Sequence, residues 1–132
     1  MKLLRVSTAV STIVTTLLFS SSVLAVDGTP LRESNGVLVD SAGKTVYTYD
    51  KDESGGGKSN CVGACARNWP PVNADGVKIS PPYSAITRED GSKQLVHRGK
   101  PLYTFIKDKK EGDKTGDGVG GVWHVVTDAA RH

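Results

Sequence analysis

Two cysteines, Cys61 and Cys65, are the residues of this chain best suited to chemistry, because they are its only thiols and lie four positions apart. Paired thiols can form a disulfide, exchange electrons as a dithiol, or bind a soft metal ion as thiolates. In an exported protein a disulfide is the expected outcome, since compartments outside the cytoplasm are oxidising. Ala66, rather than a histidine, follows the second cysteine, which argues against covalent attachment of a c-type haem.

A copper site is the alternative chemistry of the cysteine pair. Thiolates of Cys61 and Cys65, joined by an imidazole from His97 or His124, would supply the soft ligands that Cu(I) prefers. The cysteine spacing does not select a metal, and no sequence pattern links either histidine to the pair. We therefore expect a disulfide and no cofactor, with periplasmic copper handling as the alternative.

Acidic loops hold the other residues that could do chemistry. Residues 50–55 copy the opening of a calcium-binding loop, with oxygen ligands at the first, third and fifth positions. Cys61 replaces the bidentate glutamate of the twelfth position, so a hydrated hairpin loop is the expected structure. Asp52 and Asp108, one from each acidic loop, would be the carboxylates of an enzyme, but no motif of a known catalytic class accompanies them. We expect no enzymatic activity.

The first 25 residues predict export. Lys2 and Arg5 precede an apolar stretch at residues 9–19, and small residues follow up to Ala25. This pattern is typical of a secretory signal peptide, so we expect residues 1–25 to be removed. The mature chain would then be periplasmic or secreted, with no insertion into the membrane. No cysteine near the boundary could carry a lipid anchor.

Residues 26–132 would remain after cleavage, which is the length of one domain. Loss of Lys2 and Arg5 would lower the formal charge from +3 to +1. The lysines of the second acidic loop also alternate with aspartates and a glutamate. Neither the total charge nor its distribution indicates a nucleic-acid partner.

A repeated pattern of ten residues shows which elements must position these side chains. Residues 43–52 read GKTVYTYDKD and residues 99–108 read GKPLYTFIKD. Alternating residues predict that each copy ends a hairpin, which would span residues 36–49 in the first case and 94–105 in the second. A hairpin unit of this size cannot bury its own apolar face, so the two units should pack on each other.

The fold class that follows is mostly β. We expect a small single domain, residues 26–132, made of two pseudo-symmetric antiparallel hairpin repeats at about 36–71 and 93–127. One short helical turn is expected near the cysteine pair, at residues 62–68. A short strand is also expected between the repeats, at residues 77–79.

Most of the aromatic residues fall at equivalent positions of the two repeats. They are Tyr47, Tyr49, Trp69, Tyr103, Phe105 and Trp123. We expect them to form a shared core, with the tyrosine hydroxyls hydrogen-bonded at its edge. The alternative is a stacking surface for a sugar or another flat ligand.

These residues resemble a bacterial secreted-repeat family with a Tyr-x-(Phe/Trp/Tyr)-x-x-Asp motif, many of whose members are predicted lipoproteins. The residues that match the motif are Tyr47, Tyr49, Asp52, Tyr103, Phe105 and Asp108. The resemblance covers nearly all of the mature chain, including residues 61–71 and 88–91. This chain departs from the lipoprotein members because it lacks a lipidation cysteine. The family has no known function, so the resemblance implies a fold and export but no activity.

Taken together, the patterns favour a non-enzymatic exported protein of the cell envelope. We expect a binding or interaction module whose partner is an envelope protein, a glycan or a small molecule. Two features discriminate the alternatives. A metal-handling protein would bind metal only after reduction of the cysteine pair, and in an enzyme Asp52→Asn or Asp108→Asn would remove an activity without lowering the melting temperature.

Overall fold

A computed structural model describes residue 13 and residues 30–127 of the chain. The expected signal peptide, residues 1–25, lies outside the described residues apart from this single position. Seven short strands and one short α-helix make up the described part, so the mostly β class is confirmed. No helix within it is long and apolar enough to cross a membrane.

The first half of the domain begins with a tight hairpin. Strands β1 (Arg32–Ser34) and β2 (Val37–Val39) pair antiparallel across the turn Asn35-Gly36, where both residues have positive φ. Asn-Gly is the preferred dipeptide of such two-residue turns, because asparagine and glycine tolerate the left-handed region. The expected first repeat starts only at residue 36, so it omits β1.

The second half repeats this arrangement with longer strands. Strands β4 (Tyr83–Thr87), β5 (Lys93–His97) and β6 (Lys100–Pro101) form a sheet in that order. Arg98 and Gly99 form the turn between β5 and β6, within the hairpin predicted at residues 94–105. Residues 77–79 form no strand, so that expectation is wrong. Val77 instead donates its N–H to the Ala74 carbonyl, which makes a turn.

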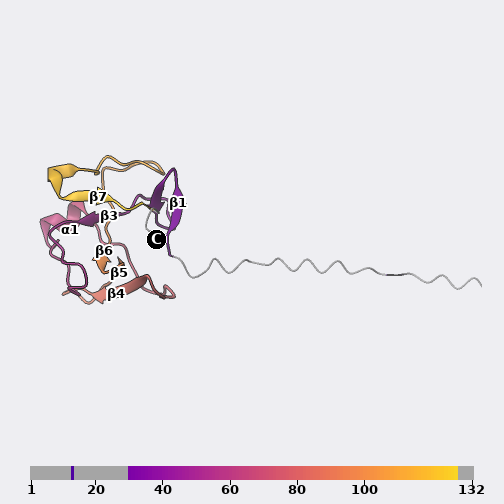
Figure 1. The fold of residues 1–132 in the computed structure, drawn as a ribbon, viewed down its shortest axis with the longest axis horizontal. Helices are drawn as coiled ribbons and strands as arrows, with labels where there is room; N and C mark the ends of the chain where they lie inside the picture. Colours follow the sequence, from indigo (N-terminus) through magenta and orange to yellow (C-terminus); the bar gives the residue numbers. More distant parts are fainter. Residues whose placement is uncertain (1–12, 14–29, 128–132) are drawn as a thin grey trace, which may run out of the picture.

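The predicted hairpins begin as expected, but the second segment of each one goes on to pair with the opposite repeat. Val46 donates to the Leu38 carbonyl at 3.0 Å, as a hairpin at residues 36–49 requires. The next three residues form β3 (Tyr47–Tyr49), which pairs antiparallel with β7 (Trp123–Val125) at the end of the second repeat (Figure 1). In the other half, Tyr103 forms an antiparallel bridge with Pro71 of the first repeat. Each repeat thus supplies the strand that completes the other.

The short helix α1 (Ala64–Asn68) confirms the helical turn expected near the cysteine pair. It follows Gly63, whose φ is +61°, and ends before Trp69. The two prolines after the tryptophan prevent its continuation, since proline clashes with the preceding turn and disfavours helix in the residue before it. A single 3₁₀ turn, η1 (Val119–Gly121), precedes β7.

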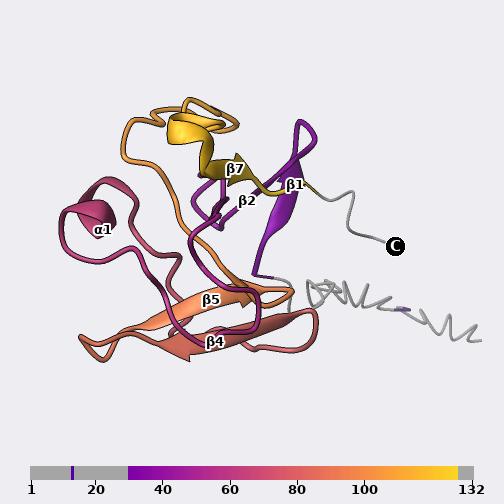
Figure 2. The ribbon, with the colours of Figure 1, turned by 60° about the vertical axis from the view of Figure 1, so that its left-hand side comes forward.

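Two clusters form the core. One is mainly aliphatic and includes residues of β2, β4 and β5. Figure 2 shows the β1–β2 hairpin on one side of the domain and strands β4 and β5 on the other. The other cluster is aromatic and lies where the two repeats exchange strands. Its buried members are Tyr47, Cys61, Trp69, Tyr103, Phe105 and Trp123. The aromatic side chains singled out by the repeat therefore form a shared core rather than a ligand-stacking surface.

Candidate functional site

The two tyrosines that open the repeated motif hydrogen-bond to the aspartate that closes the opposite copy. Tyr47 Oη donates to Asp108 Oδ2 at 2.6 Å, and Tyr103 Oη donates to Asp52 Oδ2. All four side chains are buried, with Asp52 only 1% exposed and Asp108 4% exposed. Buried carboxylates need hydrogen-bond donors, and each receives one from the other repeat.

The second oxygen of each aspartate orders the loop that follows it. Asp52 Oδ1 accepts the N–H of Asn60 at 2.6 Å. Asp108 Oδ1 accepts both the N–H of Thr115 at 3.0 Å and its hydroxyl at 2.5 Å. Each motif aspartate thus joins the opposite tyrosine to its own loop.

The backbones of the two tyrosines meet at the centre of this arrangement. Tyr47 N donates to the Tyr103 carbonyl at 2.8 Å, and Tyr103 N donates back to the Tyr47 carbonyl at 3.0 Å. The two motif copies are therefore related by a local twofold axis that passes between these residues. Because each tyrosine lies five residues before its own aspartate, the axis brings each one to the aspartate of the other copy.

Burial changes the acid–base properties of both tyrosines. Burial is the main cause that raises the pKa of Tyr47 above its ordinary range, and the hydrogen bond to Asp108 raises it further. The pKa of Tyr103 is raised by burial and by Asp52 in the same way. Both phenols therefore stay protonated as donors, and neither can serve as a base near neutral pH.

This shift predicts a loss of stability in alkali. The unfolded chain releases a tyrosine proton near pH 10, whereas the folded chain holds the protons of Tyr47 and Tyr103 to higher pH. Their contribution is complete below about pH 10 and is lost as the pH rises above that value. Urea unfolding between about pH 9 and 11.5 should show the free energy of unfolding falling with pH. In Tyr103→Phe the free energy of unfolding should fall less steeply with pH. A slope equal to that of the wild type would contradict the assignment of this effect to Tyr103.

Four aromatic rings stack across the same axis. The central pair is Trp69 and Trp123, with ring centroids 3.8 Å apart and planes 2° from parallel. Phe105 stacks on the outer face of Trp69 at 4.0 Å, and Tyr49 stacks on Trp123 at 4.3 Å. Each outer ring comes from the repeat opposite to the tryptophan that it covers.

A glycine makes room for one end of this stack. A Cβ on Gly116 would lie 2.6 Å from Trp69 Cη2 and 2.9 Å from Phe105 Cδ2. The N–H of Gly116 also donates to Tyr47 Oη at 3.2 Å. No other residue fits here without displacing the rings, so Gly116 of the second loop is part of the core.

The cysteine pair forms a disulfide, as expected. Cys61 and Cys65 are joined, and Cys61 is fully buried against the aromatic cluster. The carbonyl of Cys61 accepts a hydrogen bond from Arg88 Nη2 at 2.7 Å, and Arg88 Nη1 donates to Gln94 Oε1 at 2.7 Å. Arg88 thus ties the disulfide loop to the β4–β5 sheet. No sequence pattern indicated this role of Arg88.

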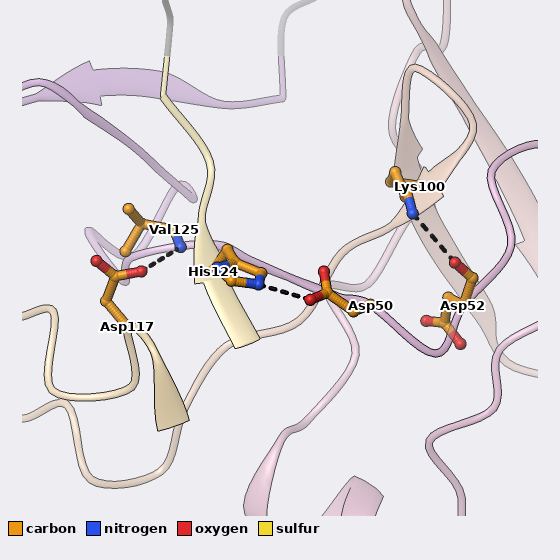
Figure 3. A network of polar contacts seen from close by, with 6 residues as sticks. All are labelled: Asp50, Asp52, Lys100, Asp117, His124 and Val125. Atoms are coloured by element: carbon orange, nitrogen blue, oxygen red, sulfur yellow. Dashed lines mark hydrogen bonds and ion pairs between the residues drawn. The ribbon is translucent and has the colours of Figure 1, made fainter. Parts of the chain in front are cut away.

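The histidines of the copper alternative take part in other contacts. His97, at the end of β5, packs beside the Tyr83 ring at 5.1 Å. His124 Nε2 lies 2.7 Å from Asp50 Oδ2, and both side chains are about half exposed (Figure 3). No group of three or more His, Cys, Asp or Glu side chains able to hold a metal occurs within residues 30–127. The thiolates required by the alternative are joined in the disulfide.

Residues 50–55 resemble a calcium loop in sequence but do not have its geometry. The oxygens expected as calcium ligands form hydrogen bonds with separate partners: Asp50 with His124, and Asp52 with Tyr103 and Asn60. Ser54 Oγ donates to the Arg98 carbonyl. The aspartates of this loop therefore connect elements of the fold, as Figure 3 shows for Asp50.

Comparison with protein families gives a match in each half of the chain. A family model described as a secreted repeat of unknown function matches residues 28–73 and residues 84–127, more than half of the chain. The chain belongs to this secreted-repeat family. No curated protein and no solved structure matches it. The two matched ranges enclose the expected repeats and extend each toward the N-terminus, over β1 in the first half and most of β4 in the second.

Membership of the secreted-repeat family agrees with an exported protein that contains a duplication. In this secreted-repeat protein, the geometry also explains the spacing of the Tyr-x-aromatic-x-x-Asp pattern. The tyrosine and aspartate form the reciprocal hydrogen bonds, and the aromatic between them, Tyr49 or Phe105, closes one end of the ring stack. All three positions have structural roles.

One surface feature of the secreted-repeat protein lies outside its motif. A depression of about 230 Å³ is open beside the disulfide loop and is lined by Val62, Gly63, Ala66, Arg88, Glu89 and Asp90. We call it the Val62 depression, because the apolar side chain of Val62 is 53% exposed there. Sequence patterns could not reveal it, since the loop and the sheet meet only after folding.

Proposed function

We propose that this protein is a non-catalytic binding module of the cell envelope that acts in the periplasm or outside the cell. The observation that carries the proposal is the burial of the two carboxylates that an enzyme would use. Asp52 and Asp108, the candidate carboxylates of an enzyme, are buried and bound to tyrosines. A general acid or base must reach a substrate, and these two groups have no open path to one.

The Val62 depression is the proposed ligand site. It combines an exposed apolar side chain with charged groups at its rim, which is the usual composition of a small recognition surface. Arg88 is held by Gln94 and Cys61, whereas Glu89 is exposed. The disulfide and Arg88 keep the loop in place, so the site is formed before a ligand arrives.

Nuclear magnetic resonance of the ¹⁵N-labelled mature chain would test this role. Three probes represent the ligand classes: soluble muropeptides for glycans, a mixture of short random-sequence peptides for proteins, and a small-molecule fragment set. We expect one class to shift the amide signals of Val62 and Glu89. Val62→Asp should weaken that binding about tenfold, because burial of a valine contributes about 1.5 kcal/mol.

Val119→Asp is the matched control. Val119 is also an exposed valine, 40% exposed, but it lies on η1 and does not line the depression. Its replacement should leave binding unchanged. No shifts with any probe, or shifts equally lost in both variants, would contradict a binding role for the depression. Conversion of a probe into products would show an enzyme instead.

A further inference from the structure

Strand β4 has a free edge. In its sheet the order is β4-β5-β6, so β4 pairs with β5 on one side and with no strand of the described chain on the other. Figures 1 and 2 both place β4 at the boundary of the domain. An unpaired edge offers a row of main-chain donors and acceptors to another extended segment.

The pairing register identifies which groups face outward. Ala85 lies opposite Leu95, but Leu95 donates its N–H to the Val72 carbonyl and accepts from Leu102 N, both on the far side of β5. The Ala85–Leu95 pair is therefore a non-hydrogen-bonded pair of the antiparallel ladder. Alternation along the strand gives Thr87 the same orientation. The N–H and C=O of Ala85 and Thr87 thus point away from the sheet.

The side chains of β4 leave this edge open. Ser84, Ala85 and Thr87 are exposed, small and uncharged, and the strand from Tyr83 to Thr87 contains no proline and no charged residue. Natural proteins protect exposed edges with such residues or with bulges. An unprotected edge of five residues is the length of an ordinary strand pairing.

The edge leads into the Val62 depression. A smaller hollow of about 50 Å³, lined in part by Thr87, Arg88 and Glu89, shares Val62 with it. A segment paired with β4 would pass the end of the strand at this point. Its next apolar side chain could cover Val62, and a basic residue beside it would meet the exposed carboxylate of Glu89.

A second copy of the chain fits the edge less well. In antiparallel self-pairing centred on Ala85, the next outward-facing residue beyond Thr87, Glu89, would lie opposite Pro81, which has no N–H to donate. Tyr83 N is already used, since it donates to the Ser80 carbonyl. So short a contact falls below the area of a stable dimer. A separate peptide can supply an N–H at every position, and it can extend beyond the strand into the Val62 depression.

We propose that β4 binds an extended polypeptide segment as an added strand, with an apolar residue of that segment in the Val62 depression and a basic residue at Glu89. This inference rests on the binding role proposed above and names the partner class as protein. Main-chain hydrogen bonds to Ala85 and Thr87 would supply affinity, and the depression would supply specificity.

Peptides selected from a displayed random library on the mature chain would test the inference. Each selected peptide is then synthesised in two forms, with backbone N-methyl groups on alternate residues in opposite phase. Only one phase removes the donors that face β4. That form should bind about tenfold more weakly, and the other should bind like the parent peptide. Ala85→Pro, which removes an outward N–H and breaks no ladder bond, should weaken binding similarly.

The remaining outcomes separate this inference from the binding role. Equal binding of both N-methylated forms would overturn strand addition, while loss of binding in Val62→Asp would leave the depression as a ligand site. Muropeptide shifts at Val62 without any selected peptide would overturn the peptide class alone. Failure of every probe would overturn both. Light scattering that shows a wild-type dimer made monomeric by Ala85→Pro would assign the edge to a second copy.

Discussion

Trp69→Ala is expected to lower the free energy of unfolding by about 3 to 5 kcal/mol. Trp69 is 5% exposed and contacts Trp123 on one face and Phe105 on the other, so the deletion leaves a cavity between two rings of the stack. The aromatic geometry lost with it adds to the loss of buried area. Urea unfolding followed by circular dichroism measures the change, which is a large part of the stability of a small domain.

Two further variants sharpen this experiment. Trp123→Ala should cost a similar amount, because the local twofold axis gives Trp123 an equivalent position against Tyr49. Val119→Ala, at an exposed site, should change the free energy of unfolding little. An unchanged stability in Trp69→Ala would mean that the stack is a ligand surface rather than a core.

Asp108→Ala is the second change with a large expected effect. It removes the acceptor of the buried Tyr47 hydroxyl and of both donors of Thr115, which lies at the surface. The buried Tyr47 hydroxyl left without an acceptor costs about 1 to 3 kcal/mol, and the Thr115 donors cost less because water can reach them, so a total of about 3 kcal/mol is expected. Asp108→Asn should recover part of this, since the amide oxygen still accepts.

The same pair of variants separates a structural aspartate from a catalytic one. Asp75→Ala serves as the control, because Asp75 is exposed and its carboxylate accepts no hydrogen bond within the described residues. Stability measured by thermal unfolding should fall in Asp108→Ala and stay near wild type in Asp75→Ala. If Asp108→Asn instead removed an activity and left the melting temperature unchanged, the proposal of a non-catalytic module would fail.

Local features of this fold could be predicted from the sequence, because they depend on neighbouring residues. Alternation and the Gly-Lys turns predict the hairpin starts, and the prolines after Trp69 limit the helix at residues 64–68. The β1–β2 hairpin also had a local signal, the Asn35-Gly36 dipeptide, but the repeat-based interpretation began the first hairpin at Gly36 and so did not treat this dipeptide as a turn.

The exchange of strands could not be predicted in this way. Tyr47–Tyr49 has the same local preference for extended structure whether it pairs within its own repeat or with β7. The choice depends on burial of the aspartates and the ring stack, which bring together residues about 60 positions apart, such as Tyr47 and Asp108. The candidate site could not be predicted for the same reason, since Val62, Arg88 and β4 meet only in the folded chain.

The reciprocal strand exchange has a consequence for how the duplication works outside the cell. A single repeat would have its tyrosine, aspartate and tryptophan without the partners that only another repeat supplies, so it would fold only by association. That association would weaken on dilution, as any bimolecular equilibrium does. Joining the repeats through the segment at residues 74–82 replaces it with an intramolecular contact at a fixed, high effective concentration. The folded population of the exported chain is therefore independent of its own concentration, which suits a protein released into a large volume.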